Sequence, residues 1–219
     1  MYEKNDSDTL IIVFSGFSDT PVYNYVRTLK SINANKLFLL DDFGYRGSYY
    51  WYEHGTNLPS ELLISLIQKM LSGGVKRVIT LGSSKGGTCA IYYGLMFGAT
   101  DIYAGACQYK VGTYLNVDAH KMIFTQMMGE GASDKEQRIL DEMLMRQIQN
   151  NCNSDTIVHL LYSEKEHTYP EHIKYLISDL EENHITHIDK IENFTNHDDV
   201  GKFFSIWIKT EINNLLKSK

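Results

Sequence analysis

Short continuous apolar runs alternate along the chain with longer segments in which apolar residues recur every three or four positions. Short runs rich in β-branched residues are typical of strands buried on both faces, and they occur at residues 10–14, 36–40, 75–81, 102–106, 156–162 and 185–191. Helical spacing occurs at residues 21–32, 59–72, 88–97, 170–182 and 200–216, and two more helices are expected within 117–150. This alternation predicts an α/β fold with a mainly parallel central sheet and helices on both faces, a three-layer sandwich.

No repeat, linker or low-complexity tract divides the 219 residues, so we expect a single domain over residues 1–219. Right-handed crossovers place the strand-to-helix loops of such a domain at one edge of the sheet, where ligands bind. Residues 117–150 are rich in methionine and charge. They form a candidate helical lid over this edge, and ordinary helix packing explains the same composition equally well.

One strand-to-helix junction has the residues that a strained nucleophile turn needs. Gly82-Ser83-Ser84-Lys85-Gly86 matches the pattern G-x-S-x-G, with a strand run before it and a helical run after it. Glycines two positions before and after Ser84 leave room for the tight backbone path, and the start of the helix favours negative charge there. The phosphate-binding patterns with Gly-Lys-Ser/Thr or G-x-G-x-x-G are absent. We therefore predict that Ser84 is an acylatable nucleophile, with Ser83 as the alternative serine.

A serine nucleophile needs a general base, and the base needs an orienting carboxylate. Of the eight histidines, His197 alone lies in the loop after the last predicted strand, where the base is expected if the chain order is serine, acid, histidine. The loop after the fifth predicted strand offers Glu164 and Glu166, and Glu166 lies four residues before Pro170, a spacing often seen for such an acid. We predict His197 as the base and Glu166 as the acid, with Glu164 and Asp198 as alternatives.

Attack on a carbonyl also needs two backbone N–H donors that stabilise the oxyanion. The N–H of Lys85, the residue after the candidate nucleophile, is one candidate. The loop after the first predicted strand offers the other, because Gly16 allows a turn there and Phe17 or Ser18 would then donate. We expect Lys85 and Phe17 to form this oxyanion hole, and the alternative is that the loop is a simple strand-ending turn.

The segment 42–55 is unusually aromatic, with four tyrosines and one tryptophan beside Arg46. Aromatic rings with polar edges suit sugar faces or planar ligands, and a guanidinium suits a carboxylate or a phosphate. We expect Arg46, Tyr49 and Trp51 to bind substrate. A buried packing cluster is an equally strong interpretation of the same residues.

Charge and cysteine content argue against several classes of protein. The formal net charge is −6 and the basic residues are scattered, whereas nucleic-acid binding normally shows a basic stripe. The three cysteines are widely spaced, so we expect free thiols in a reducing compartment and no metal site. The N-terminal segment is too polar for a signal peptide, and no apolar run is long enough to span a membrane. We expect a cytoplasmic protein that acts on a small acyl ester or an acylated carbohydrate and needs no cofactor.

The order Ser84, Glu166, His197 resembles that of the α/β-hydrolase superfamily across nearly the whole chain. More narrowly, the sequence Phe-Ser-Gly-Phe at 14–17, the aromatic segment 42–55 and Gly-Ser-Ser-Lys-Gly-Gly look like bacterial hydrolase-like proteins of capsule biosynthesis and accessory secretion. That resemblance implies carbohydrate O-acetyl chemistry. The glutamate acid departs from the superfamily's more usual aspartate.

Three functions are compatible with this resemblance. The first is a serine esterase or deacetylase that cleaves short acyl esters, O-acetyl groups on carbohydrate among them. The second is an O-acyltransferase that uses the same acyl-enzyme. The third is a non-catalytic partner protein in polysaccharide or secretion machinery, because a fold alone does not confer an activity. The intact order of serine, acid and histidine favours the first two.

Overall fold

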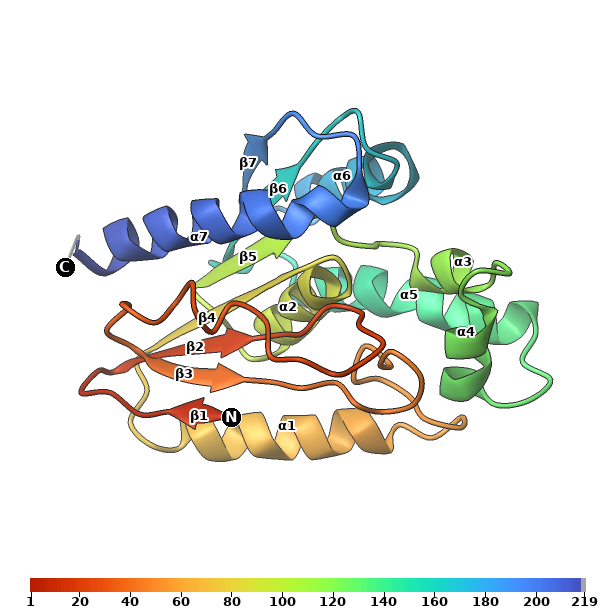
Figure 1. Cartoon of the computed structure of the whole chain (residues 1–219), viewed down its shortest axis with the longest axis horizontal. Coiled ribbons are helices and arrows are strands. Elements are labelled where there is room, and N and C mark those ends of the chain that lie inside the picture. The colour runs from red at the N-terminus through yellow and green to blue at the C-terminus, as the bar shows by residue number, and fades with distance from the viewer. Residues whose placement is uncertain (218–219) are drawn as a thin grey trace.

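The computed structural model describes residues 1–217 and contains a seven-stranded sheet in the order β1-β3-β2-β4-β5-β6-β7 (Figure 1). Strands β2 to β7 are parallel, and β1 pairs antiparallel with β3 at one edge. The strands are β1 (Tyr2–Glu3), β2 (Thr9–Val13), β3 (Asn35–Phe38), β4 (Arg77–Ser83), β5 (Asp101–Gly105), β6 (Ile157–Tyr162) and β7 (His187–Ile191). The predicted mainly parallel α/β architecture is confirmed, and the sequence pattern missed only the short strand β1.

Helices cover both faces of this sheet (Figure 1). They are α1 (Leu58–Leu71), α2 (Lys85–Met96), α3 (Val111–Leu115), α4 (Lys121–Met128), α5 (Asp134–Asn150), α6 (Lys174–Glu182) and α7 (Val200–Lys217). A π-helical turn, η1 (Tyr169–Ile173), precedes α6, and a 3₁₀ turn, η2 (His197–Asp199), precedes α7. Helix α7 packs on one face, whereas α1, α2, α5 and α6 contribute to the core on the other.

The two faces of the sheet bury two separate hydrophobic cores because side chains alternate along each strand. In β2, Leu10 and Ile12 belong to the core with α1 and α2, and Ile11 and Val13 belong to the core with α7. All five residues of β2 are buried. A strand that is apolar on both faces is what a doubly covered parallel sheet requires.

The loops that follow the carboxyl ends of the parallel strands all open at one edge of the sheet. They carry, in strand order from β2 to β7, Phe17, Arg46, Ser84, Gln108, Glu166 and His197. Five of these six residues are those that the sequence analysis selected, and the sixth, Gln108, is new. The topology therefore brings together side chains that are far apart in the chain.

The predicted helix at residues 21–32 is wrong. The segment forms a series of turns, in which the Leu29 N–H donates to Tyr25 O at 3.0 Å and the Ile32 N–H donates to Leu29 O at 3.0 Å. Tyr25 has a φ of 60°, which a helix does not allow. Its apolar residues still cover the sheet, because Leu29 and Ile32 are buried in the core with α7.

The two helices expected within residues 117–150 are present as α4 and α5. A capping box starts α5: the Ser133 side chain accepts from the Lys135 N–H, and the Glu136 carboxylate accepts from the Ser133 N–H at 2.9 Å. Leu140, Leu144 and Ile148 on α5 are fully buried in the main core. Packing of α5 accounts for these residues, and the role of 117–150 as a lid stays a prediction.

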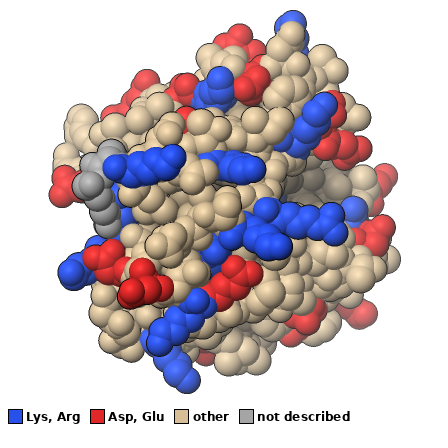
Figure 2. Space-filling view, turned by 60° about the vertical axis from the view of Figure 1, so that its left-hand side comes forward, with Lys and Arg blue, Asp and Glu red and all other residues tan. Residues whose placement is uncertain are grey.

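Surface properties agree with the even spread of charge in the sequence. Lysine and arginine side chains are interspersed with aspartate and glutamate across the face in Figure 2. Within residues 1–217, no helix is both long and apolar enough to cross a membrane. The three cysteines are free thiols, with Cys89 and Cys107 buried and Cys152 exposed.

Candidate active site

Ser84 lies on a sharp turn between β4 and α2, with φ 53° and ψ −128°. The turn requires glycine on both sides. A Cβ on Gly82 would lie 2.3 Å from Gly86 O, and a Cβ on Gly86 would lie 2.6 Å from Phe14 O. The Ser84 N–H donates to Gly105 O at 2.7 Å and so fixes the turn to β5. A non-glycine residue with positive φ, held by its neighbours, is the strained geometry that raises a serine side chain above the sheet.

The structure brings Ser84, His197 and Glu166 together in one chain of hydrogen bonds. His197 Nε2 lies 2.8 Å from Ser84 Oγ, and His197 Nδ1 lies 3.0 Å from Glu166 Oε1. His197 begins the turn η2 after β7, and Glu166 belongs to the loop after β6. In this arrangement the imidazole faces the serine hydroxyl on one side and a carboxylate on the other, as in a serine–histidine–acid triad.

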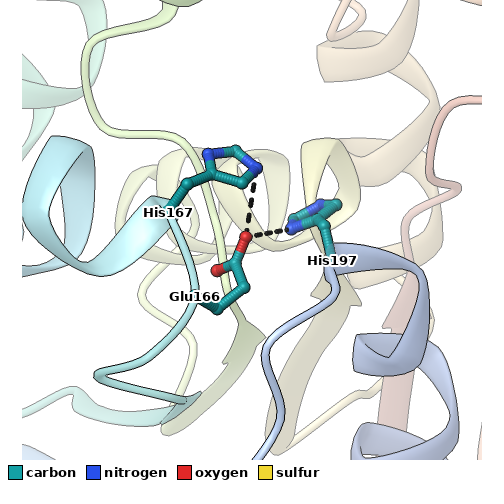
Figure 3. Close-up of side chains that lie close together, drawn as sticks. All are labelled: Glu166, His167 and His197. Atoms are coloured by element: carbon teal, nitrogen blue, oxygen red, sulfur yellow. Dashed lines mark hydrogen bonds and ion pairs between the residues drawn. The ribbon is translucent and has the colours of Figure 1, made fainter.

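The carboxylate of Glu166 is buried, and both of its oxygens have partners. Its Oε2 accepts from the Thr168 N–H at 3.1 Å and from the Thr168 hydroxyl. Its Oε1 is approached from two sides, by His197 Nδ1 and by His167 Nε2 at 3.1 Å (Figure 3). Burial alone would raise the pKa of Glu166, but hydrogen bonds from His197 and Thr168 and the nearby imidazoles outweigh it and lower the pKa. Glu166 is therefore ionised at neutral pH.

The alternative residues lie elsewhere. Ser83 Oγ is hydrogen-bonded to the Tyr25 hydroxyl at 2.5 Å, whereas Ser84 Oγ is the one that faces His197. Glu164 is exposed, two residues from the buried Glu166. Asp198 lies in the wall of the cavity beside His197 rather than behind its Nδ1 atom.

A cavity of about 300 Å³ opens at Ser84. Its wall combines the loop after β2, the turn 24–25, the start of α7 and parts of the segment 114–120. Besides Ser84, the lining residues are Gly16, Phe17, Asn24, Tyr25, Arg46, Ser83, Tyr114, His120, His197, Asp198, Val200 and Gly201.

The Gly16 N–H donates to Asn24 Oδ1 at 3.1 Å, which holds the loop beside Ser84. Lys85 is the first residue of α2, so its N–H belongs to the turn that has no intrahelical acceptor. Phe17 and Lys85 are thus both next to Ser84, and their role as oxyanion donors stays a prediction.

The side chain of Lys85 forms a buried ion pair with Asp41. Its Nζ lies 2.5 Å from Asp41 Oδ2, and neither side chain is exposed. The ammonium lies 4.9 Å from the centre of the Tyr50 ring and 5.7 Å from that of Phe17. The residue after Ser84 is therefore tied to the loops after β2 and β3.

The aromatic segment 42–55 divides between the cavity and the core. Arg46 lies in the cavity wall, with its Nε 3.0 Å from Asp19 Oδ1. Tyr49 and Trp51 are fully buried, with stacked rings 5.2 Å apart, and belong to the main core. The expectation that Tyr49 and Trp51 contact substrate is corrected: they pack against α2, as the alternative interpretation held.

A second cavity, of about 550 Å³, adjoins the first and shares Tyr114 and His120 with it. Lys110, Glu171 and His172 also line it. His172 is 2% exposed, and its Nδ1 accepts from the Lys110 N–H at 3.2 Å. Burial lowers the pKa of His172 to about 4, so the ring is neutral at pH 7.

The chain resembles the solved capsule O-acetyltransferase of Neisseria meningitidis serogroup A, in a variant bound to CoA, with 24% identity and a TM-score of 0.79 over 96% of this chain and 89% of that chain. The fluorophosphonate-binding serine hydrolase FphF of Staphylococcus aureus matches with 13% identity and a TM-score of 0.68 over 96% and 84% of the two chains. The fold is that of the α/β-hydrolases.

A third solved structure with this hydrolase fold is the glycosylation-associated Gap123 complex from Streptococcus agalactiae, with 18% identity and a TM-score of 0.76. That match covers 95% of this chain and 42% of the other. No family model and no curated protein matches the sequence. Likeness at these identities establishes the α/β-hydrolase fold, and a fold alone does not confer an activity.

Three side chains at this site carry atoms that could coordinate a metal ion. A carboxylate oxygen of Glu166 and a ring nitrogen each of His167 and His197 lie within 4.8 Å of one another (Figure 3). Imidazole and carboxylate are common zinc ligands. The same atoms already contact one another, so a metal there would compete with the hydrogen bond between His197 and Glu166.

Sequence reasoning missed several residues that contact this site. Gln108 follows β5 and donates from Nε2 to Ser84 Oγ at 3.1 Å. Its position after a parallel strand was a usable signal, because each neighbouring strand end carries a site residue. Tyr25, Tyr114 and His120 reach the cavity from turns and short helices, and no sequence motif marks them.

Proposed function

We propose that this protein is a serine hydrolase that cleaves short acyl esters through an acyl-enzyme. Ser84 Oγ attacks the acyl carbonyl carbon while its proton passes to His197 Nε2. The tetrahedral intermediate then collapses, and the leaving alcohol takes the proton from His197 and leaves the acyl group on Ser84. Water next gives a proton to His197 and attacks the acyl carbon; the bond between that carbon and Ser84 Oγ then breaks, Oγ takes the proton from His197, and the acid is released.

One observation carries this proposal: His197 Nε2 is 2.8 Å from Ser84 Oγ while its Nδ1 is 3.0 Å from the buried carboxylate of Glu166. The carboxylate selects the tautomer in which Nδ1 carries the hydrogen, so Nε2 is free to accept the serine proton. It also stabilises the imidazolium that forms. The cavity of about 300 Å³ at Ser84 suits a small acyl group such as acetyl.

A panel of p-nitrophenyl esters tests the proposal. We expect the wild-type protein to hydrolyse acetyl and propionyl esters, and we expect Ser84→Ala to reduce turnover at least about 10³-fold. Ser83→Ala is the matched control. Because the Ser83 hydroxyl is hydrogen-bonded to Tyr25 and not to His197, this variant should keep turnover within a few-fold of wild type. Equal turnover by wild type and Ser84→Ala would contradict the proposal, and it would favour the non-catalytic partner function that the hydrolase fold also allows.

The second cavity supports O-acyl transfer as the second candidate function. A transferase needs room for an acyl donor and an acceptor, and the cavity of about 550 Å³ shares Tyr114 and His120 with the Ser84 cavity. The acyl-enzyme on Ser84 would be common to both reactions, with a sugar hydroxyl in place of water in the second step. Because the capsule O-acetyltransferase is structurally similar, carbohydrates with free hydroxyl groups are the first acceptor class to test.

Hydrolysis and transfer are distinguished by the fate of the acyl group. The protein is incubated with acetyl-CoA, with and without oligosaccharide acceptors, and products are followed by mass spectrometry. Gain of 42 Da by an acceptor, lost in Ser84→Ala, would make the protein a transferase. Release of acetate at the same rate with and without acceptor would make it a hydrolase.

A further inference from the structure

Gln108 lies behind the proposed nucleophile and is completely buried. It follows β5, and its Nε2 donates a hydrogen bond to Ser84 Oγ at 3.1 Å. Ser84 Oγ thus has two partners, because it donates to His197 Nε2 and accepts from Gln108. The backbone of Gln108 is held by Thr88 of α2, whose hydroxyl accepts from the Gln108 N–H at 3.0 Å and donates to Gln108 O at 2.7 Å.

The orientation of the Gln108 amide is set by Tyr49. The Tyr49 hydroxyl donates to Gln108 Oε1 at 3.3 Å. A tyrosine hydroxyl that donates there requires the amide oxygen on its own side, so the NH₂ group must face Ser84. Tyr49 is fully buried, and burial raises its pKa well above the ordinary range, so its hydroxyl keeps the proton at any pH at which the protein works.

We infer that Gln108 is a catalytic residue whose side-chain N–H stabilises the negative charge that builds on Ser84 Oγ as its proton leaves. Tyr49 is then a positioning residue that acts through Gln108. The inference rests on the proposed function. When Oγ bonds to the acyl carbon and its proton passes to His197, the carbonyl electron pair moves to oxygen. As that proton leaves, negative charge builds on Oγ, and the N–H of Gln108, which is completely buried and lines neither cavity, stabilises the charge there.

This role accounts for a buried polar network that packing alone does not require. A buried amide and a buried phenol hydroxyl would each cost free energy without partners. Here each satisfies the other, and the chain Tyr49–Gln108–Ser84 ends at the hydroxyl oxygen that loses its proton during the reaction. It also gives Tyr49 a function at the site, although its ring contacts no substrate.

The test compares Gln108→Met and Tyr49→Phe in the p-nitrophenyl acetate assay. Methionine keeps the length of the side chain and lacks the donor. We expect kcat of Gln108→Met to fall about 10²-fold with KM within about threefold, because a hydrogen bond that strengthens as charge builds on Oγ lowers the barrier and leaves substrate binding unchanged. Tyr49→Phe should lower kcat about fivefold to tenfold, since the amide can then turn.

The double variant is the decisive measurement. Because Tyr49 acts only through the amide, Tyr49→Phe should have no further effect on kcat once Gln108 is methionine. Gln147→Met, a buried glutamine of α5 outside both cavities, is the matched control and should keep wild-type kcat. Additive losses in kcat from the two substitutions, or wild-type kcat in Gln108→Met, would overturn the inference.

Two controls keep the result interpretable. Ser84→Ala is measured in the same assay: if it keeps full turnover the proposed function fails, whereas loss with Ser84→Ala and none with Gln108→Met overturns only the role of Gln108. If Gln108→Met does not fold, judged by its melting curve, Gln108→Glu decides instead. Glutamate keeps the shape and replaces the donor with an acceptor, so a folded Gln108→Glu with wild-type kcat would also overturn the inference.

Discussion

Lys85 Nζ lies 2.5 Å from Asp41 Oδ2, and both side chains are entirely excluded from solvent. The Asp41 carboxylate also accepts from the N–H groups of Ser48 at 2.9 Å and Tyr50 at 3.3 Å. Tyr50 has a φ of 56°, so these bonds stabilise a backbone conformation that is otherwise unfavourable. The ion pair therefore joins the nucleophile turn to the aromatic segment 42–55.

Removing one member of this pair should lower the free energy of unfolding more than removing both. A lone buried charge costs about 3–5 kcal/mol, so we expect Lys85→Met and Asp41→Asn each to lower the free energy of unfolding by about that amount. The double variant, which leaves no buried charge, should lose less than either single variant. Urea denaturation measures all three, and Lys76→Met, an exposed lysine, should change stability by less than about 1 kcal/mol. Additive losses would contradict the buried pair.

Glu166, and not Glu164, should be the acid of the triad. Glutamine at 166 keeps the shape but removes the charge that stabilises protonated His197, so we expect turnover to fall about 10²- to 10⁴-fold. Glu164→Gln is the matched control, because Glu164 is exposed, and its turnover should stay near wild type. A small loss with Glu166→Gln, or an equal loss with both variants, would remove Glu166 from the proposed mechanism.

His172 should make the protein less stable in mild acid. Its pKa is about 4 in the folded protein against 6.5 for the free side chain. Because the unfolded chain binds the proton first, the free energy of unfolding should fall as pH drops from 6.5 towards 4, by about 2 kcal/mol between pH 7 and pH 5. His172→Gln should lose that part of the pH dependence in urea denaturation at the two pH values. An unchanged pH dependence in the variant would show that His172 titrates normally.

Gly82 and Gly86 should tolerate no side chain. An added Cβ would meet backbone oxygen at 2.3 Å and 2.6 Å, and backbone cannot move aside as a flexible side chain can. We expect Gly82→Ala and Gly86→Ala to be insoluble or to melt well below the wild type. In Gly73→Ala the nearest atom outside its neighbours is 3.5 Å away, so this control should fold normally. Soluble, active protein from either Gly82→Ala or Gly86→Ala would mean that the turn at Ser84 has a different shape.

Local signals in the sequence were enough to predict the parallel sheet and the serine, histidine and glutamate that meet at its edge. Each of these residues follows a strand in a loop with recognisable turn residues, and parallel topology brings strand ends together whatever the details of packing. Helical spacing at residues 21–32 was misleading because the backbone there depends on tertiary contacts. Tyr25, with positive φ, bonds through its hydroxyl to Ser83, which is 58 residues away in the chain.

The same limit explains the misassigned aromatic residues. Composition shows that Tyr49 and Trp51 are aromatic, but whether they face a cavity or the core depends on α2, where Tyr92 packs against Trp51 with ring centres 5.1 Å apart. Gln108 was missed for a different reason: an isolated glutamine after a strand carries no motif. Its place after a parallel strand is the one signal in the sequence, and its distance to Ser84 Oγ is what assigns it to the site.

Covalent labelling of Ser84 is the most direct test of the account. The protein is treated with a fluorophosphonate, and its intact mass and peptide map are measured for wild type, Ser84→Ala and Ser83→Ala. The account predicts one probe adduct per chain on the peptide that contains Ser84, the same adduct in Ser83→Ala, and none in Ser84→Ala. Folded wild-type protein that gains no adduct, or a Ser84→Ala variant that still gains one, would contradict the assignment of Ser84 as the nucleophile.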